Sequence, residues 1–162
     1  MRTPSTITVW LALTLSACSA PSAREFGKAD VENINKLFQE FIVTYNAKDA
    51  AKLVNFFTPG GVVLPPNAST VRGTENVREY YVRRFARGAS DLKLEPRDIA
   101  GVGALAFANG DYSLNMAPPD GPVRRDRGKF LFILRDLKGT WQLDQLMFSS
   151  DFAPETAPPP SS

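Results

Sequence analysis

Histidine is absent from the entire chain of 162 residues. It is the side chain used most often for general acid–base catalysis, and it is the commonest protein ligand of transition metals. Any reaction in this protein would therefore depend on carboxylates, tyrosines or other groups. We expect neither a metal nor any other cofactor.

Cysteine is almost as scarce, because Cys18 is the only one. No disulfide can form within the chain, so the fold must depend on its hydrophobic core. The apolar run at residues 7–17, ITVWLALTLSA, is shorter than the ~20 residues of a membrane-spanning helix. A positive start, a short apolar segment and small residues at its end predict a secretory signal peptide over residues 1–17.

The end of that segment, LSAC at residues 15–18, resembles the lipobox of bacterial lipoproteins. The resemblance implies cleavage before Cys18, a lipid on its thiol and anchoring to a membrane of the bacterial cell envelope. Ser19 follows the cysteine. In Gram-negative lipoproteins a residue other than Asp at that position implies sorting to the outer membrane, on its periplasmic side. The alternative is a secreted protein with an incidental free thiol.

The chain has no large excess of positive or negative residues. Removing residues 1–17 takes away only Arg2, which leaves 18 Lys and Arg against 17 Asp and Glu. Binding to nucleic acid usually needs a clustered positive surface. The short basic run at 124–129 is too small for this, so we expect no nucleic-acid partner.

Composition divides the rest of the chain into three parts. Residues 18–28 are interpreted as a lipidated N-terminus and tether, and residues 29–153 as one domain of ordinary size. Residues 154–162, PETAPPPSS, form a Pro/Ser-rich tail that we expect to be extended and disordered.

Apolar periodicity predicts three helices followed by strands. The helices are expected over 31–46 behind a cap at Asp30, in a short segment behind Asp49 that Pro59-Gly60-Gly61 ends, and from Thr74 onward. Two short strands are expected at 62–64, where two prolines follow, and at 70–72. Longer strands are expected at 92–102, 104–116, 129–137 and 141–149. This order predicts an α+β fold with a mostly antiparallel sheet.

The last two predicted strands are apolar on both faces. Phe130 and Phe132 alternate with Leu131 and Ile133. An antiparallel strand with one buried face usually alternates apolar and polar residues. We therefore expect a second copy of the chain to cover the outer face of the sheet, as a homodimer.

Three segments together resemble the nuclear transport factor 2-like superfamily, which includes SnoaL-like cyclases and ketosteroid isomerase. They are YNAKDAAKLVNFFTPGGVVLPP, VRGTENVREYY and KGTWQLDQLMFSSDFAP. The resemblance covers Ala29 to Pro154. It implies a cone in which three N-terminal helices pack on a strongly curved sheet, with a cavity open at one end. Many members dimerise through the outer sheet face.

The catalytic groups of ketosteroid isomerase are missing from the matching positions. That enzyme uses an Asp base and an oxyanion hole made of a Tyr and a protonated Asp. Here the Tyr position falls on Phe41, the base on Pro65 and the protonated Asp near Gly128. None of these residues can exchange a proton through its side chain. Relatives with a His–Asp dyad are excluded as mechanistic models as well.

Several residues are candidates for lining the cavity of the cone, and none is assigned a catalytic role. They are Tyr45, Phe57, Tyr81, Asp111, Arg127 and Trp141. Asp111 would share a strand face with Asn109 and Ser113 and would be placed to pair with Arg127. The simpler interpretation is core packing for the aromatic residues and a structural ion pair for the charged ones.

Three functions remain open from the sequence. We expect a protein that binds a small apolar or amphipathic molecule in its cone, or a protein partner, without catalysis. The first alternative is an isomerase, cyclase or dehydratase that uses Asp111 with Tyr45 or Tyr81. The second is a structural role through the outer sheet face, since a fold alone does not determine function.

Overall fold

Six strands form one sheet in the computed structural model, which describes residues 24–119 and 121–152. The elements are α1 (Lys28–Asn46), α2 (Ala50–Leu53), η1 (Val54–Phe56), β1 (Phe57–Leu64), β2 (Val71–Arg72), α3 (Thr74–Ala86), β3 (Ala89–Val102), β4 (Leu105–Met116), β5 (Arg124–Leu137) and β6 (Thr140–Ser150). The strand order is β2-β1-β6-β5-β4-β3. The predicted α+β class is confirmed. The signal peptide, Cys18 and the C-terminal tail lie outside the described residues.

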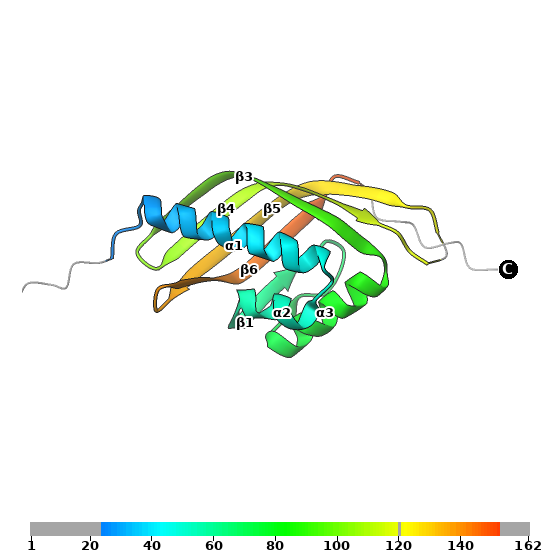
Figure 1. The fold of residues 1–162 in the computed structure, drawn as a ribbon, viewed down its shortest axis with the longest axis horizontal. Coiled ribbons are helices and arrows are strands. Elements are labelled where there is room, and N and C mark those ends of the chain that lie inside the picture. The colour runs from blue at the N-terminus through cyan, green and yellow to red at the C-terminus, as the bar shows by residue number, and fades with distance from the viewer. Residues whose placement is uncertain (1–23, 120, 153–162) are drawn as a thin grey trace, which may run out of the picture.

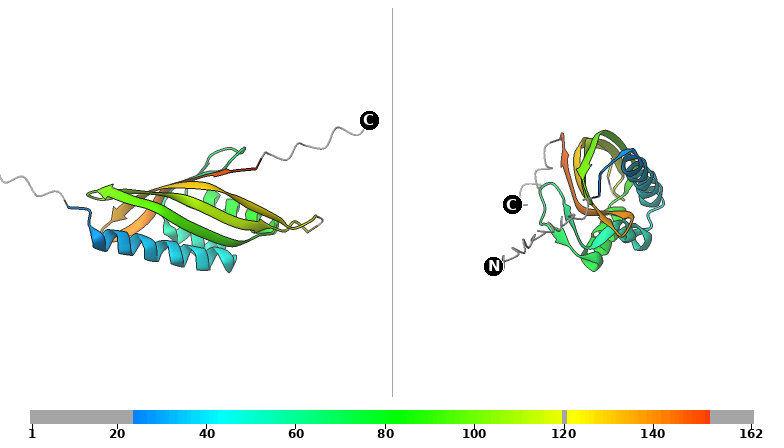
Figure 2. Two further views of the ribbon diagram at one scale, coloured as in Figure 1. Left: turned by 90° about the horizontal axis from the view of Figure 1, so that it is seen from above. Right: turned by 90° about the vertical axis from the view of Figure 1, so that its left-hand side faces the viewer.

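The sheet curves around α1. Strands β3 to β6 arch over this helix, and α2, α3 and β1 close the other side of it (Figure 1). Seen end-on, helices and sheet enclose a common interior (Figure 2). The arrangement gives the molecule one interior, bounded by α1, α3 and the concave face of the sheet.

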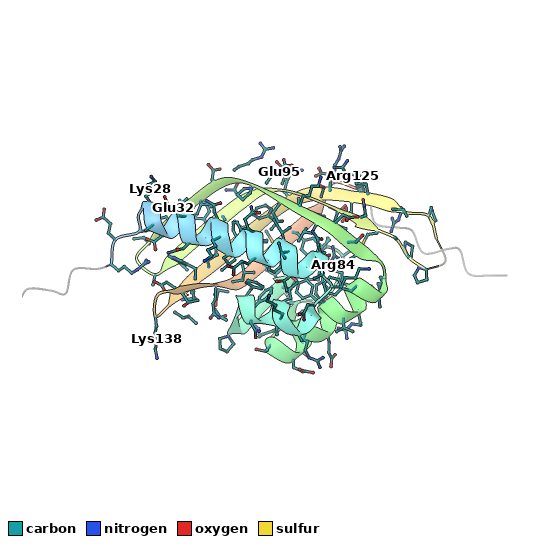
Figure 3. All side chains as sticks on the ribbon, in the orientation of Figure 1. Lys28, Glu32, Arg84, Glu95, Arg125 and Lys138 are labelled. Carbon is teal, nitrogen blue, oxygen red and sulfur yellow. The ribbon has the colours of Figure 1, made fainter. Side chains whose placement is uncertain are left out.

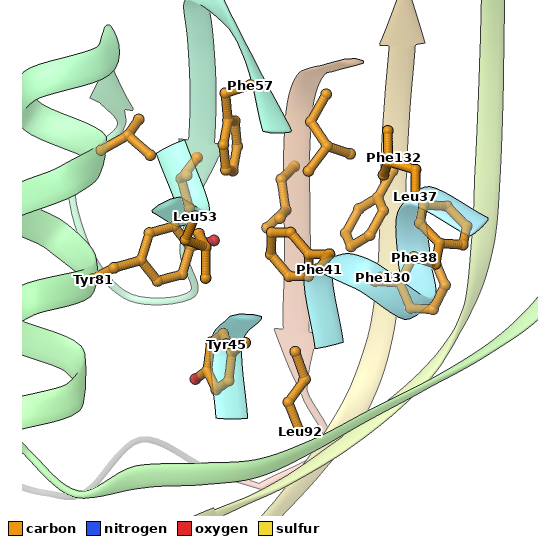
Figure 4. Close-up of a cluster of buried hydrophobic side chains, with 14 of the residues drawn as sticks. Leu37, Phe38, Phe41, Tyr45, Leu53, Phe57, Tyr81, Leu92, Phe130 and Phe132 are labelled. Carbon is orange, nitrogen blue, oxygen red and sulfur yellow. The ribbon is translucent and has the colours of Figure 1, made fainter. Parts of the chain in front are cut away.

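The core follows from two periodicities. The inward face of α1 carries buried residues three and four apart, including Ile34, Phe38 and Phe41. On β5 every second residue is buried, and the Phe38 and Phe132 rings meet edge to face with centroids 5.4 Å apart. These side chains fill the interior between the helices and the sheet (Figure 4). A buried Phe contributes about 1.5–3 kcal/mol relative to an exposed one.

The segment Pro59-Gly60-Gly61 was predicted to end a helix, but it lies inside β1. Chain register supports this placement, because Phe57 pairs with Leu143 and Val62 with Gln145 on β6. Four residues of β1, 58–61, therefore lie opposite the single residue Asp144 of β6, and the strand bulges. The β1–β6 pairing is parallel, so the short strands join the four-stranded meander instead of forming a separate piece. Pro65 ends β1, as predicted.

The start of α1 also differs from the prediction. Gly27 is the N-cap, and Asp30 lies three residues later, where its carboxylate accepts the Gly27 N–H at 2.9 Å. An acidic group at this position satisfies a backbone donor that the helix leaves free.

A group of side chains, which we call the N-terminal clasp, holds the start of the chain against the sheet. Arg24 forms ion pairs with Asp30 and with Asp136, the latter at 3.2 Å. Trp141 Nε1 donates to Asp30 Oδ1 at 3.1 Å, and Phe26 packs edge-on against the Trp141 ring. Arg24 and Phe26, which the sequence assigned to the tether, are therefore part of the packed domain.

Candidate functional site

A small pocket lies between the C-terminal half of α1, α3 and the concave face of β3 to β6. Eight aromatic side chains, four leucines and Arg84 line it. Its volume is about 40 Å³, which is room for about three water molecules. We call it the aromatic pocket. Pockets that hold drug-sized molecules measure about 300–1,000 Å³, so this one admits only a small group in the form seen here.

Tyrosine and phenylalanine rings build the wall by edge-to-face contacts. The Tyr45 ring lies 6.0 Å from that of Tyr81 and 5.0 Å from that of Phe85, and Phe41 meets Tyr81 at 6.4 Å. These contacts join α1 to α3, and the rings of Tyr45, Phe41 and Tyr81 face a common interior (Figure 4). Edge-to-face pairs add about 0.5–1.5 kcal/mol beyond their buried area, so the wall is held firmly.

Arg84 is the charged group of the aromatic pocket. Its Nε donates to Tyr45 Oη at 2.9 Å, and its Nη1 donates to Tyr80 Oη at 3.4 Å. The guanidinium carbon also lies 5.0 Å from the centre of the Phe148 ring. The side chain reaches from α3 to Tyr45, near the end of α1 (Figure 3). Arg84 as a residue is half-buried, while its guanidinium group is enclosed by protein.

The tyrosines of the aromatic pocket remain neutral phenols near pH 7. Burial raises the pKa of Tyr45, Tyr80 and Tyr81 above the usual 10, most strongly for Tyr81. Burial lowers the pKa of the Arg84 guanidinium, but the tyrosine oxygens beside it raise that pKa by more. Arg84 therefore stays charged, and its direct hydrogen-bond partners carry no charge.

One carboxylate lies near the pocket, on β5. Asp126 accepts hydrogen bonds from Tyr112 Oη at 3.1 Å and from Ser150 Oγ at 2.6 Å. Burial and this carboxylate raise the pKa of Tyr112 above its usual value. Among the described residues that line the aromatic pocket, none is acidic.

Two of the six predicted cavity residues line the aromatic pocket, namely Tyr45 and Tyr81. Phe57 packs directly behind the wall, with its ring 6.4 Å from that of Phe41. Trp141 belongs to the N-terminal clasp and does not reach the pocket.

Asp111 and Arg127 were wrong as cavity residues, because both lie on the outer face of the sheet. On β4 the even-numbered residues from 106 to 114 are buried and the odd ones face outward. Asp111 pairs with Arg97 of β3 at 2.5 Å, and not with Arg127. The Arg127 guanidinium lies over the Phe152 ring instead. Asp111 does share its face with Asn109 and Ser113, as predicted.

The three positions that match the isomerase catalytic groups are scattered. Phe41 lines the aromatic pocket, while Pro65 and Gly128 do not. The described residues hold no cluster of three Asp, Glu or Cys side chains that could bind a metal ion.

A model of the SnoaL-like domain matches residues 38–140, which is more than half of the chain. The chain belongs to the SnoaL-like family. Its nuclear transport factor 2-like fold is confirmed by solved structures that share 15–20% of its sequence. No curated protein matches the sequence.

The similar structures come from several bacteria. A ketosteroid isomerase-like protein of Erwinia carotovora atroseptica has a TM-score of 0.71 and 19% identity, over 78% of this chain and all of the other. A nuclear transport factor 2-like protein of Novosphingobium aromaticivorans has a TM-score of 0.65 and 15% identity, over 78% and 85%. A conserved protein of Planctomyces limnophilus has a TM-score of 0.67 and 20% identity, over 75% and 98%.

The sequence reasoning missed Arg84 in this SnoaL-like domain. The signal was available, since Arg84 lies seven, four and three residues after Val77, Tyr80 and Tyr81 on the buried stripe of α3. A charged side chain on the apolar stripe of a helix is unusual, and it indicates a functional or structural role for that residue.

Proposed function

We propose that this SnoaL-like protein binds a small amphipathic molecule in the aromatic pocket and catalyses no reaction there. The composition of the pocket wall carries the proposal. Rings and leucines suit an apolar body, and the guanidinium of Arg84 suits a polar end. Ligand sites are typically concave and apolar with few polar groups.

The proton-transfer groups that an isomerase or dehydratase needs are poorly placed for chemistry in the pocket. Asp111 faces away from it across the sheet and is paired with Arg97. Asp126 does not line the pocket, and it accepts hydrogen bonds from the hydroxyls of Tyr112, which does, and of Ser150. The buried tyrosines hold their protons, because burial raises their pKa. A general base must lie within hydrogen-bond reach of the proton that it removes.

The binding proposal is tested by filling the pocket. Leu94 is half-buried and lines the wall, whereas Leu105 lies on the outer sheet face. Native mass spectrometry of the mature chain from its own host envelope should reveal a bound small molecule. Leu94→Phe should reduce its occupancy at least tenfold, and the matched variant Leu105→Phe should retain it. Equal occupancy in the two variants, or no bound molecule and no thermal shift with metabolite panels, would contradict the proposal.

The lipid anchor at Cys18 is a separate part of the proposal. The LSAC run and Ser19 support it. Within residues 24–119 and 121–152, no helix has the length and apolarity needed to cross a bilayer. Cys18→Ser should leave uncut precursor in the inner membrane fraction and abolish labelling by a fatty-acid analogue. Normal cleavage of that variant, with no label on the wild type, would show that the protein is secreted instead.

We also infer that a second copy covers the outer sheet face. Six apolar side chains from four strands gather there, and we call them the outer apolar patch: Val102, Leu105, Phe107, Leu131, Ile133 and Met147. Ion pairs lie beside it, with Arg135 paired to Asp144 and Arg97 paired to Asp111. The charges beside the patch are therefore neutralised within one copy, so two identical faces meet without strong repulsion.

A further inference from the structure

Arg84 is an enclosed cation that has no anionic partner among the described residues. Its contacts are the hydroxyls of Tyr45 and Tyr80 and the ring of Phe148. Buried charges in proteins are normally paired, because taking an ion out of water costs several kcal/mol. Phenol oxygens and a ring face offset part of that cost but leave the net charge in place.

The free donors of Arg84 have a defined geometry. A guanidinium has five N–H groups in a planar fork. The Nε–H group donates to Tyr45 and one N–H of Nη1 donates to Tyr80. Nη2 donates to no described residue. Arg84 is one of the residues that line the cavity. The Nη1–Nη2 edge of a guanidinium presents two parallel N–H groups, which match the two oxygens of a carboxylate.

The nearby charges favour an anion at this edge. Asp126 is the nearby carboxylate, and it is satisfied by Tyr112 and Ser150 instead of by Arg84. Arg87, the C-cap residue one turn after Arg84, lies near Tyr80, where its charge opposes the larger effect by which burial raises the Tyr80 pKa. The end of the pocket at α3 thus carries two cations, Arg84 in the wall and Arg87 near Tyr80.

Charge and space together select the kind of anion. One enclosed guanidinium and neutral phenols balance a single negative charge, whereas a phosphate monoester carries close to two and offers three oxygens. The cavity of about 40 Å³ and its aromatic wall suit a short apolar body of a few atoms. A carboxylic acid with a chain of two or three carbons meets both conditions.

We propose that the ligand of the aromatic pocket is a small carboxylic acid whose carboxylate binds the Nη1–Nη2 edge of Arg84. This inference rests on the proposed binding function and adds the chemical class of the ligand. Arg84 provides the specificity for the anion, and the tyrosines hold its guanidinium in place.

The test compares acids with neutral molecules of the same shape. Calorimetric titrations of the mature chain would use acetate against acetamide, propionate against propionamide, and methyl phosphate. We expect each acid to bind at least tenfold more tightly than its amide, and methyl phosphate to bind less tightly than acetate. Arg84→Gln should remove the preference, and Arg84→Lys should retain part of it. Arg83→Gln is the matched control, because Arg83 lies exposed on the same helix and pairs with Glu79.

The outcomes separate this inference from the binding function on which it rests. Equal affinity for acid and amide in the wild type would overturn the carboxylate assignment and leave the proposed function standing. Tighter binding of methyl phosphate than of acetate would also overturn it. No binding of either pair at millimolar concentration would overturn both. The comparison in the wild type needs no variant, so it holds even if Arg84→Gln fails to fold.

Discussion

Asp30 shows how much one residue can hold together. Its carboxylate accepts the Gly27 N–H at the start of α1, the indole N–H of Trp141 on β6 and the guanidinium of Arg24. The backbone hydrogen bond from Gly27 holds the pKa of Asp30 below its usual value of 3.8, assisted by Trp141 and Arg24, while burial works against them. One buried carboxylate therefore links the first turn of the first helix to the last strand.

The lowered pKa of Asp30 gives the stability a defined pH dependence. When the pKa of a carboxyl is lower in the folded state than in the unfolded state, its contribution to stability is complete at any pH above the unfolded-state pKa. This contribution disappears as the pH falls through the folded-state pKa. We expect the wild-type Tm to fall below about pH 4 more steeply than that of Asp30→Asn, and the variant to be the less stable of the two at pH 7. Thermal melts by circular dichroism from pH 2 to 7 measure this. Parallel curves for the two proteins would contradict it, and Asp98→Asn, at an exposed position on β3, is the control.

The two buried tyrosine hydroxyls near Arg84 differ in their partners. Tyr45 Oη accepts from Arg84 Nε, whereas the Tyr81 hydroxyl makes no hydrogen bond to a described residue. Tyr45→Phe leaves a donor of an enclosed cation unsatisfied, so we expect a loss of about 1–2 kcal/mol in the free energy of unfolding. Tyr81→Phe should change it by less than about 0.5 kcal/mol, in the range of substitutions that remove no interaction. Urea denaturation measures both values, and equal losses would refute the distinction.

At the scale of elements, the close approach of β5 and β6 depends on a missing side chain. Gly128 is buried, and a Cβ there would lie 1.8 Å from the Ser149 carbonyl oxygen. The sequence comparison placed a catalytic Asp of ketosteroid isomerase near this position. In this SnoaL-like domain the backbone of the neighbouring strand occupies that space, so the position supports the sheet and has no chemical role.

Gly128→Ala should therefore destabilise the sheet strongly. Extra atoms in a packed region cost about 1–3 kcal/mol, and we expect the upper end, about 3 kcal/mol, because the obstacle is backbone. Gly60→Ala is the matched control, since a Cβ at Gly60 meets nothing within 4 Å. Guanidinium unfolding should show a lower midpoint for Gly128→Ala alone. A midpoint equal to that of Gly60→Ala would mean that the strands move apart at little cost.

Helices and strands that follow from the local periodicity of apolar residues were predictable from the sequence. Features that depend on pairing with strands far along the chain were not. The stripe on α1 and the alternation on β5 reveal a helix and a strand without reference to the rest of the chain. The bulge at Pro59-Gly60-Gly61 exists because β1 pairs with β6, more than 80 residues away. Strand alternation also cannot say which face is concave, so Asp111 and Arg127 were assigned to the wrong side. Tyr45 and Tyr81 lie on helix stripes, which point to the core, and both line the aromatic pocket.

The whole molecule presents one unusually apolar surface, the outer apolar patch. Phe107 is 40% exposed on β4, opposite Ile133 of β5, and Met147 on β6 is 44% exposed. Such residues on the outer face of a sheet expose apolar area to water unless another surface covers them. The two-sided apolar pattern that suggested a dimer from the sequence is thus present on the described surface.

Self-association can be tested by placing a charge in the patch. Phe107→Glu should convert a dimer into a monomer, because an isologous interface repeats the new charge on both copies. Val82→Glu is the control, since Val82 is 47% exposed on α3, on the other side of the molecule. Sedimentation equilibrium at about 100 µM distinguishes the two masses. A monomeric wild type, or the same dimerisation in both variants, would exclude the patch as a dimer interface.

The N-terminal clasp determines how the protein would sit at a bilayer. Six peptide steps separate Cys18 from Arg24, so the clasped end lies at most about 20 Å from a lipid attached to Cys18. The aromatic pocket lies near Tyr45, at the other end of a helix that is about 28 Å long. In a chain anchored through Cys18, the aromatic pocket would lie at the end of α1 farther from the lipid, where a dissolved molecule could reach it without crossing the headgroups.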